Sequence, residues 1–284
     1  MILIDMNQVM ISNFMAQIGN HTNTKVEENM FRHMVLNSLR SYNVKYSSEY
    51  GKMVIACDSG NCWRKQVFPF YKANRKKKNE SSEIDWKQIY SYMNKIVNEL
   101  RDNFPYKVVA VEAAEADDII ASVVKKHKED NEQSKILILS GDKDFIQLHL
   151  YDKVEQYDPV RKKWIKHPDP SVFLTEHILK GDSGDGIPNV LSPDNCFVIG
   201  ERQKTMTKQR YVNLIKTKVN DYDAVTKRNF FRNQELIDLN CIPYEIYNKV
   251  IEELYKDYNK DRSKILNYMI KNKLTNLTEY ISEF

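Results

Sequence analysis

Ten acidic residues occupy short motifs from which their side chains could bind divalent metal ions. None of these motifs contains His or Cys as a supporting ligand, and ligands that are all oxygen select Mg²⁺ or Mn²⁺ over Zn²⁺. This many carboxylates exceeds what one Mg²⁺ uses, so the sequence predicts two Mg²⁺ ions, for which Mn²⁺ can substitute. Paired ions suit in-line displacement at phosphorus, which makes phosphate esters the expected substrates. The ten residues are Asp5, Asp58, Glu112, Glu115, Asp117, Asp118, Asp142, Asp144, Asp182 and Asp185.

A structural role is the alternative for each acid taken alone, because Asp after a strand is often a turn residue or a helix N-cap. The group Glu115-Ala116-Asp117-Asp118 argues for a cation, since three carboxylates within four residues repel one another unless a positive charge neutralises them. Asp182 and Asp185 stay open, because two acids between glycines could also be paired turn residues.

Strand-like apolar runs must position these acids. Four such runs each lead within three residues to an acid: residues 1–4, 53–57, 108–111 and 136–139. Unbroken apolar runs with helical stretches between them predict buried parallel strands, and ligands bind beyond the carboxyl ends of such strands. Helical spacing at residues 26–46, 84–100 and 116–127 completes an α/β fold with a mostly parallel central sheet flanked by helices.

From residue 170 onward the spacing is helical without strand-like runs. We therefore predict an α/β core at residues 1–169 and a helical region at residues 170–284. With 284 residues and 42% hydrophobic content, the chain can bury a substantial core. No apolar stretch reaches the roughly 18 residues of a membrane span and no export signal opens the chain, so we expect a cytoplasmic protein with no membrane partner.

The four cysteines give no metal or disulfide pattern. They form no Cys-x-x-Cys pair with a matching second pair, which predicts reduced thiols. They are Cys57, Cys62, Cys196 and Cys241.

The net charge of +4 conceals a separation of charges. Without the ten motif acids, 43 basic residues face 29 of the 39 acidic ones, and many of the basic residues are clustered. A basic surface around an acidic centre is expected of a protein that binds a polyanion, although any one cluster could equally be a solvated face. The clusters lie at residues 64–65, 75–78, 125–126, 161–163 and 204–210.

The order of these motifs resembles that of the structure-specific 5′ nucleases, which include flap endonucleases, the 5′ nuclease domain of bacterial DNA polymerase I and phage 5′ exonucleases. The resemblance runs from Met1 to the ending Ile281-Ser282-Glu283-Phe284, which is similar to that of phage members. It implies a PIN-like nuclease core with a helical arch at about residues 74–103, and a helix-three-turn-helix-like DNA-binding element in the C-terminal region. The motifs that carry it are Asp5, Asp58 and residues 63–65, 71–75, 115–118, 141–145 and 181–188.

The resemblance implies two groups of metal ligands. The first ion would be held by Asp5, Asp58, Glu115 and Asp117, with Asp118 close by. Between the ions would lie Asp142 and Asp144, and the second ion would be held or tuned by Asp182 and Asp185. Glu112 is not a standard ligand of the family, so we expect it to support a ligand or to lie on the surface.

The resemblance also implies residues that bind nucleic acid. Lys72 and Arg64 would stand over the scissile phosphate, where positive charge stabilises the transition state. Tyr71 would stack on a terminal base, although a packed aromatic is an equal alternative. The family's Gly-Ile-Gly hairpin is missing after Ile187-Pro188, which leaves the potassium site of some relatives in doubt. The arch would be lined by Arg75, Lys76, Lys77 and Lys78, and the duplex would be bound by Arg202, Lys204, Lys208 and Arg210.

The expected function is that of a Mg²⁺-dependent 5′-to-3′ nuclease that cuts near the 5′ end of RNA or DNA annealed to DNA, removing RNA primers and flaps in replication. It would act as a monomer on branched or 5′-ended duplex DNA and on RNA/DNA hybrids, in the cytoplasm of a host cell if a phage encodes it. A sliding clamp and a single-strand-binding protein are candidate partners, and residues 280–284 could dock on one or could pack as a helix.

Two other functions compete with this expectation. A DNA-binding replication factor without hydrolysis would gain nothing from carboxylates beside phosphate. A phosphatase with Asp5 as its nucleophile would need a general acid two residues later, where the chain has Asn7.

Overall fold

The computed structural model describes residues 1–19, 27–258 and 260–284, apart from the side chains of residues 76–78 and 80. Its centre is a six-stranded sheet in the order β3-β2-β1-β4-β5-β6. Neighbouring strands pair in parallel from β3 to β5, and β6 joins the edge in antiparallel. The strands are β1 (Ile2–Asp5), β2 (Met53–Cys57), β3 (Lys107–Ala110), β4 (Ile136–Leu139), β5 (Val154–Asp158) and β6 (Lys163–Ile165).

The first four strands confirm the predicted parallel sheet. Their side chains are almost entirely buried and point alternately to two core clusters, with Ile2 and Ile4 in one and Leu3 in the other. Both faces of these strands are covered, which explains why they read as unbroken apolar runs. The sequence did not reveal β5 and β6, because Glu155 and Gln156 interrupt the first and the second is largely exposed.

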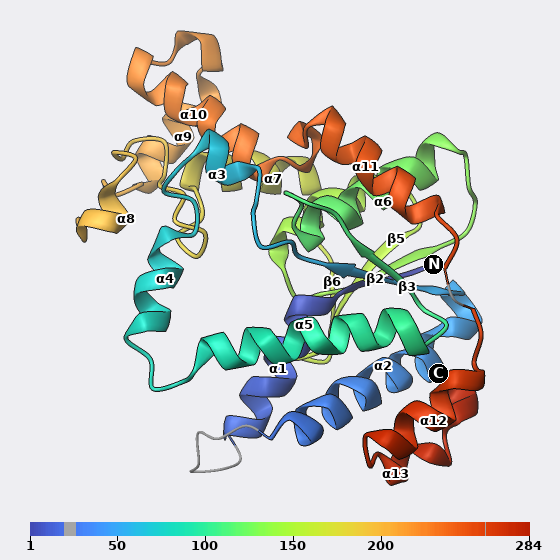
Figure 1. Cartoon of the computed structure of the whole chain (residues 1–284). Coiled ribbons are helices and arrows are strands. Elements are labelled where there is room, and N and C mark those ends of the chain that lie inside the picture. The colour runs from blue at the N-terminus through green and yellow to red at the C-terminus, as the bar shows by residue number, and fades with distance from the viewer. Residues whose placement is uncertain (20–26, 259) are drawn as a thin grey trace.

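Helices cover both faces of the sheet (Figure 1). Three of them confirm the helices predicted from spacing, although Val26, the first residue of that prediction, lies outside the described residues. On one face pack α1 (Met6–Gly19), α2 (Glu28–Tyr50) and α5 (Trp86–Asn103), and on the other α6 (Ala116–Glu129) and the 3₁₀ helix η1 (Lys143–Leu150).

From residue 170 onward, the described residues form helices joined by loops, with no strand apart from an isolated bridge between Asp182 and Ile187. The Asp169 side chain accepts a hydrogen bond from Val172 N and Pro170 opens the first helix, a combination that favours helix initiation. The elements are α7 (Pro170–Lys180), α8 (Cys196–Ile199), α9 (Lys208–Lys216), η2 (Val219–Asp221), α10 (Ala224–Ile237), η3 (Leu239–Cys241), α11 (Tyr244–Tyr255), α12 (Ser263–Lys271), α13 (Thr275–Thr278) and η4 (Ile281–Glu283).

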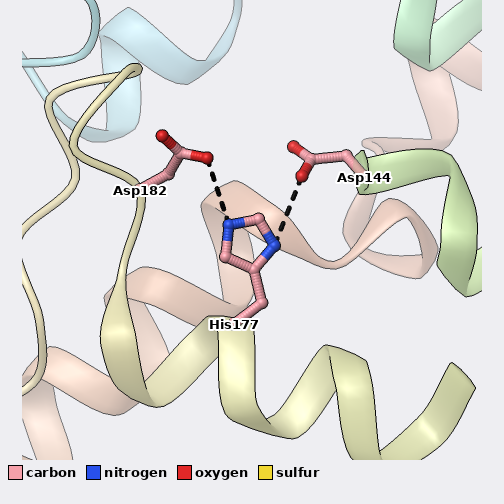
Figure 2. A group of neighbouring side chains, drawn as sticks. All are labelled: Asp144, His177 and Asp182. Atoms are coloured by element: carbon pink, nitrogen blue, oxygen red, sulfur yellow. Dashed lines mark hydrogen bonds and ion pairs between the residues drawn. The ribbon is translucent and has the colours of Figure 1, made fainter. Parts of the chain in front are cut away.

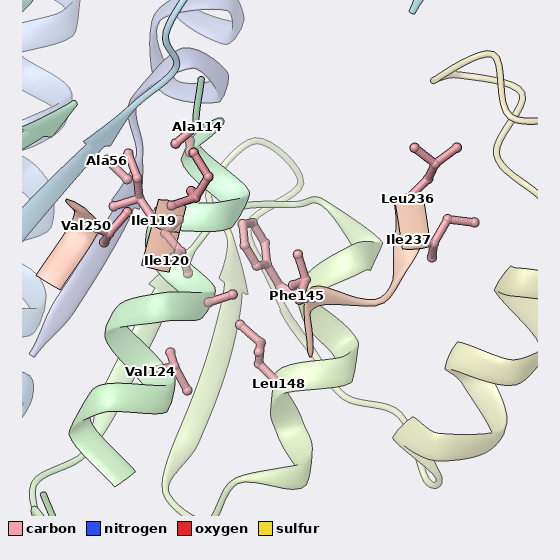
Figure 3. Close-up of a cluster of buried hydrophobic side chains, with 14 of the residues drawn as sticks. Ala56, Ala114, Ile119, Ile120, Val124, Phe145, Leu148, Leu236, Ile237 and Val250 are labelled. Carbon is pink, nitrogen blue, oxygen red and sulfur yellow. The ribbon is translucent and has the colours of Figure 1, made fainter. Parts of the chain in front are cut away.

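Several of these helices return to the sheet and complete its two cores. Figure 3 shows the core on the α6 side, where Ile120 of α6, Phe145 of η1 and Leu236 of α10 belong to one buried cluster. On the opposite side, Ile265 and Met269 of α12 belong to the cluster that contains α2 and α5. Later segments thus stabilise the layers that precede them, and a division at residue 169 stays a prediction.

The C-terminal residues pack against the protein. The ring of Phe284 is 3% exposed and lies 5.4 Å from the ring of Phe104. Arg40 Nη1 lies 2.5 Å from Glu283 Oε2, and Asn43 donates to the Glu283 carbonyl at 2.9 Å. The sequence left open whether this tail docks on a partner or packs on the protein, and in the structure it is packed.

All four cysteines lie among the described residues and are free, as predicted. Burial raises the pKa of the Cys57 and Cys62 thiols to about 12, which keeps them protonated and unreactive. Among the residues that the structure describes, no helix is long and apolar enough to cross a membrane.

One buried ion pair connects three helices. Arg32 of α2 is 1% exposed, and its Nε donates to Glu99 Oε2 of α5 at 2.7 Å. The hydroxyl of Tyr268 in α12 donates to the same carboxylate oxygen at 2.8 Å. Arg32 also pairs with Glu28, so removing Glu99 leaves this buried charge with one carboxylate partner in place of two.

We therefore predict that Glu99→Ala lowers the free energy of unfolding by about 3 kcal/mol in urea denaturation. The matched control is Glu49→Ala, which breaks an exposed pair with Lys135 at 2.5 Å. That change should cost less than about 1 kcal/mol. Equal losses in the two variants would contradict the assigned role of Arg32.

Candidate metal-binding site

The carboxyl ends of the central strands form one edge of the sheet, and an acidic cleft lies there. Asp5 ends β1, Asp58 follows β2 and Asp142 follows β4. Because β1 pairs with β2 on one side and β4 on the other, the cleft lies where the strand order reverses, the usual ligand position in such sheets. Its volume is about 320 Å³, and it is lined by Asp5, Asn7, Gln8, Ile11, Asp58, Lys72, Arg75, Tyr90, Met93, Glu115, Ala116, Asp117, Asp142 and Asp185.

Backbone and polar side chains fix the carboxylates of this cleft. Asp5 accepts hydrogen bonds from Gln8 N at 3.0 Å and from the Ser140 hydroxyl at 3.1 Å. Asp58 accepts from Ala116 N, the first residue of α6, at 2.7 Å and from Asn7 Nδ2 at 2.5 Å. In the sequence, Asn7 was notable only as the position where a phosphatase would need a general acid. In the structure its side chain orients the Asp58 carboxylate.

Crowding of these carboxylates makes their charged forms unfavourable. Burial, and then the charge of Asp58, raise the pKa of Asp5 to about 7. Burial and the charges of Asp142 and Asp5 raise the pKa of Asp117 well above its ordinary value. A divalent cation would relieve this repulsion, and the oxygen donors of the cleft fit a hard ion such as Mg²⁺.

Two basic side chains border the cleft. Lys72 Nζ lies 2.6 Å from Glu115 Oε1 and 3.6 Å from Asp185 Oδ2, and Arg75 Nη2 lies 2.5 Å from Asp185 Oδ1. Burial alone would raise the pKa of Glu115, but Lys72 and Arg64 lower it to about 2. Asp185 and Glu115 outweigh the effect of burial on Lys72 and raise its pKa, so its ammonium stays charged.

The backbone of Lys72 holds its side chain in place. Its φ is 57°, in the left-handed region that non-glycine residues seldom occupy. Its amide donates to the Asp185 carbonyl at 2.7 Å, which fastens the turn before α4 (Ala73–Glu80) to the loop that carries Asp185.

Three residues of the predicted site have buried side chains that point into the protein: Arg64, Tyr71 and Asp118. Arg64, on α3 (Arg64–Val67), is 3% exposed and pairs with Asp118 at 2.8 Å, while its Nε donates to the Leu236 carbonyl at 2.8 Å. Asp118 is fully buried and also accepts hydrogen bonds from Trp63 Nε1 and Glu115 N, the latter as part of the capping box of α6. Neither Arg64 nor Asp118 lines the cleft, and both contact Glu115, which does. Their roles toward a phosphate or an ion stay predictions.

Tyr71 is likewise buried, with 3% of its surface exposed. Its hydroxyl donates to Glu115 Oε2 at 2.8 Å and lies 3.0 Å from Asp185 Oδ2. The ring is therefore not available to stack on a terminal base, and the packed alternative is the one observed.

The remaining predicted acids lie elsewhere. Asp144 and Asp182 form a second group around His177 of α7, a residue that no sequence motif singled out (Figure 2). The imidazole Nε2 lies 3.1 Å from Asp182 Oδ2, and Nδ1 lies 3.3 Å from Asp144 Oδ1. The only signal in the sequence was the spacing of His177 five residues before Asp182. Glu112 is exposed and does not line the cleft.

The predicted arch is only partly separate from the core. In α5, Met93, Ile96 and Leu100 belong to the buried cluster on one face of the sheet. Tyr90 and Met93 of the same helix line the cleft, so residues 86–103 form a core helix as well as one side of the cleft. α4 stands away from the sheet in Figure 1. Arg75 reaches the cleft, whereas the side chains of Lys76, Lys77 and Lys78 lie outside the described residues.

The four basic residues predicted to bind duplex DNA are exposed. They lie in the loop between α8 and α9 and in the first turn of α9, and their role stays a prediction. The loop before them is held by amides instead of glycines: Asn189 Nδ2 donates to the Lys204 carbonyl at 2.8 Å, and Asn229 Nδ2 to the Val190 carbonyl at 2.9 Å. The four residues are Arg202, Lys204, Lys208 and Arg210.

Comparison with known proteins matches the sequence and the fold of this chain to nucleases. Residues 1–176 match the 5′-3′ exonuclease N-terminal resolvase-like domain, and residues 169–284 match the C-terminal domain of T4 RNase H. The ribonuclease H of Enterobacteria phage T4 is 34% identical over 297 residues, covering 99% of this chain and 95% of the relative. The chain belongs to the 5′-3′ exonuclease family and is a nuclease of that family, as the motifs predicted.

More distant relatives agree with this membership. The 5′-3′ exonuclease of Buchnera aphidicola is 30% identical over 158 residues, or 52% of this chain and 50% of the relative. The flap endonuclease Xni of Shewanella oneidensis is 31% identical over 136 residues, or 45% of this chain and 48% of the relative. Among solved structures, the T5 5′-exonuclease with bound zinc superimposes with a TM-score of 0.62 at 18% identity, over 89% of this chain and 97% of the other, which confirms the fold.

Asp142, which lines the cleft, and Asp118, which is buried behind it, should have opposite effects on stability in EDTA. Asp142→Asn removes one of the repelling charges and should raise the free energy of unfolding by about 1 kcal/mol. Asp118→Asn removes the partner of buried Arg64 and should lower it by about 3 kcal/mol. Urea denaturation measures both, and a destabilised Asp142→Asn variant would argue against repulsion in the cleft.

Proposed function

We propose that this nuclease is a Mg²⁺-dependent 5′-to-3′ enzyme that hydrolyses phosphodiester bonds near the 5′ end of RNA or DNA annealed to DNA. Its role would be the removal of RNA primers and flaps in replication, in the cytoplasm of a host cell. The observation that carries the proposal is the crowding of Asp5, Asp58, Asp117 and Asp142 in one cleft beside Lys72. A T5 flap endonuclease of this fold is described in complex with DNA and metal ions.

The side chains of the cleft suit hydrolysis at phosphorus. Asp5, Asp58, Glu115, Asp117 and Asp142 would hold two divalent ions, which when bound supply an activated water and offset charge on the attacking and leaving oxygens. Lys72 lines the cleft and pairs with Glu115, so its charged ammonium could exchange that carboxylate for a phosphate oxygen. Its ammonium would stabilise negative charge that grows in the transition state.

Positive charge outside the cleft would hold the rest of the substrate. Arg75 borders the cleft, and Arg202, Lys204 and Lys208 are exposed on the segment leading into α9. Salt-dependent contacts of this kind bind a phosphate backbone without regard to sequence. A sliding clamp or a single-strand-binding protein fits the replication role.

The competing functions find less support. A protein that only binds DNA gains nothing from buried carboxylates that repel each other and repel phosphate. An aspartyl phosphatase would need a general acid at Asn7, whose amide instead donates to Asp58.

Incubation with 5′-labelled RNA/DNA hybrid and flap substrates tests the proposal. We expect Mg²⁺-dependent products cut near the 5′ end, and we expect EDTA or Asp142→Asn to abolish them. The proposal would be refuted if cleavage persisted in EDTA or in the Asp142→Asn variant, or if the wild type cleaved neither substrate.

The same assay tests Lys72. Lys72→Met keeps the aliphatic stem but removes the charge, and it should slow cleavage by about 100-fold or more. Lys65→Met is the matched control, because Lys65 is exposed on α3 and does not line the cleft. An unchanged rate in Lys72→Met would remove Lys72 from the catalytic residues.

Duplex binding in EDTA, where no cleavage is expected, tests the basic segment. The double variant Lys204→Ala, Lys208→Ala should bind duplex DNA more weakly, and the slope of log affinity against log salt should fall by about 0.9 for each phosphate that the variant no longer neutralises. Lys52→Ala should leave the slope unchanged, since Lys52 is exposed just before β2, at the opposite edge of the sheet. The same slope in all three proteins would refute a role for these lysines.

A further inference from the structure

Gln156 is a polar residue at a buried position of β5, beside the strand whose end leads to Asp142. It is 1% exposed and lies opposite Ile138 of β4 in the sheet. Val154 and Asp158 share its face of β5 and are buried as well. A buried amide is costly unless it makes hydrogen bonds, so the partners of Gln156 indicate its role.

The Gln156 amide donates to the turn that follows β4. Nε2 lies 2.9 Å from the carbonyl oxygen of Ser140 and 2.6 Å from that of Asp142. These two carbonyls flank Gly141, so the amide spans the point where the chain turns from β4 toward η1. Turning the amide over would place its own oxygen against two carbonyl oxygens, so these acceptors fix its orientation.

The turn that Gln156 holds connects two acids of the cleft. The Ser140 hydroxyl donates to Asp5 Oδ2 at 3.1 Å, and its oxygen accepts from Asp142 N at 3.1 Å. Asp5 and Asp142 both line the cleft, where their like charges repel each other. Repulsion therefore acts to move the turn away from Asp5 while no cation is bound, and the bonds from Gln156 oppose that movement.

Asp158 confines the same turn sterically. Its Oδ1 accepts hydrogen bonds from Val160 N and Arg161 N, both at 2.9 Å, which fix the carboxylate. A Cβ atom on Gly141 would lie 2.7 Å from Asp158 Oδ2, too close for a non-bonded contact. The turn thus lies directly against the buried face of β5, and Gln156 is the side chain of that face that bonds to its carbonyls.

We propose that Gln156 is a positioning residue for metal binding: its amide holds the turn after β4 so that the carboxylates of Asp142 and Asp5 converge on the cleft before an ion binds. Gln156 would not touch the ion and would act through the backbone on either side of Gly141. Polar groups that orient metal ligands typically change metal affinity by about 10- to 100-fold. The inference deepens the proposed function and rests on it, because it concerns the ions of that reaction.

Amide hydrogen exchange of the full-length wild type in EDTA tests whether the turn is ordered without metal. We expect protected amides at Gly141, Asp142 and Asp144, since they donate to Gln8 Oε1, Ser140 Oγ and Asp142 Oδ1 respectively. Gln156→Met keeps the length of the side chain and removes its donors. This variant should exchange the three amides about 10-fold faster than the wild type does.

Binding of Mn²⁺, followed by the electron paramagnetic resonance signal of the free ion, tests the effect on metal affinity. Gln156→Met should bind Mn²⁺ about 10-fold more weakly than the wild type. The matched control is Gln147→Met, because the buried Gln147 amide bonds to the Ile237 carbonyl and to Leu239 N, away from the turn. The control also loses two hydrogen bonds, but it should keep the wild-type Mn²⁺ affinity and the wild-type exchange of the turn.

Three results would overturn the proposal: turn amides that exchange as fast as unprotected amides in the metal-free wild type, unchanged Mn²⁺ affinity in Gln156→Met, or an equal loss of affinity in the two variants. The first is decided by the wild type even if a variant fails to fold. Cleavage by a wild type whose Mn²⁺ affinity Gln156→Met retains would reject the role of Gln156 and keep the proposed function. Weaker Mn²⁺ binding in Gln156→Met alone, with no cleavage of any substrate by the wild type, would keep the role of Gln156 and reject the function.

Discussion

Repulsion among carboxylates at the carboxyl edge of the sheet is the constraint on which the rest of the structure depends. Asp5, Asp117 and Asp142 lie within range of one another's charge, although each would be more stable apart. Only a rigid frame keeps them together, and parallel strands buried on both faces supply it. Lys72 and Lys143 reduce the repulsion from the side without removing it.

The edge itself could be predicted from the sequence because it depends on local patterns. An apolar run followed by an acid marks the carboxyl end of a buried strand wherever the chain has one, so β1, β2 and β4 were recognisable. β5 and β6 were not recognisable, because the polar residues Glu155 and Gln156 interrupt β5 and because β6 is largely exposed. The order of the motifs identified the protein family, which the spacing of apolar residues alone could not do.

The inward-facing residues were beyond sequence reasoning because distant partners decide their direction. Arg64 reads as a basic residue near an acidic site, but the carbonyl it binds belongs to Leu236, 172 residues later. The same holds for His177, an isolated residue of α7 until η1 packs against that helix and brings Asp144 to it. Spacing along the chain predicts which residues share a strand end, and it does not predict which of them face the cleft.

The backbone of Lys72 carries a consequence for how this position can change. Glycine or asparagine would adopt its left-handed conformation at lower cost, but neither carries a positive charge. Arginine would keep the charge and the strain, with a planar, forked head in place of a compact ammonium. No natural side chain combines a relaxed backbone with a permanent positive charge at this turn. A substitution that relieves the backbone strain of Lys72 therefore also removes the charge.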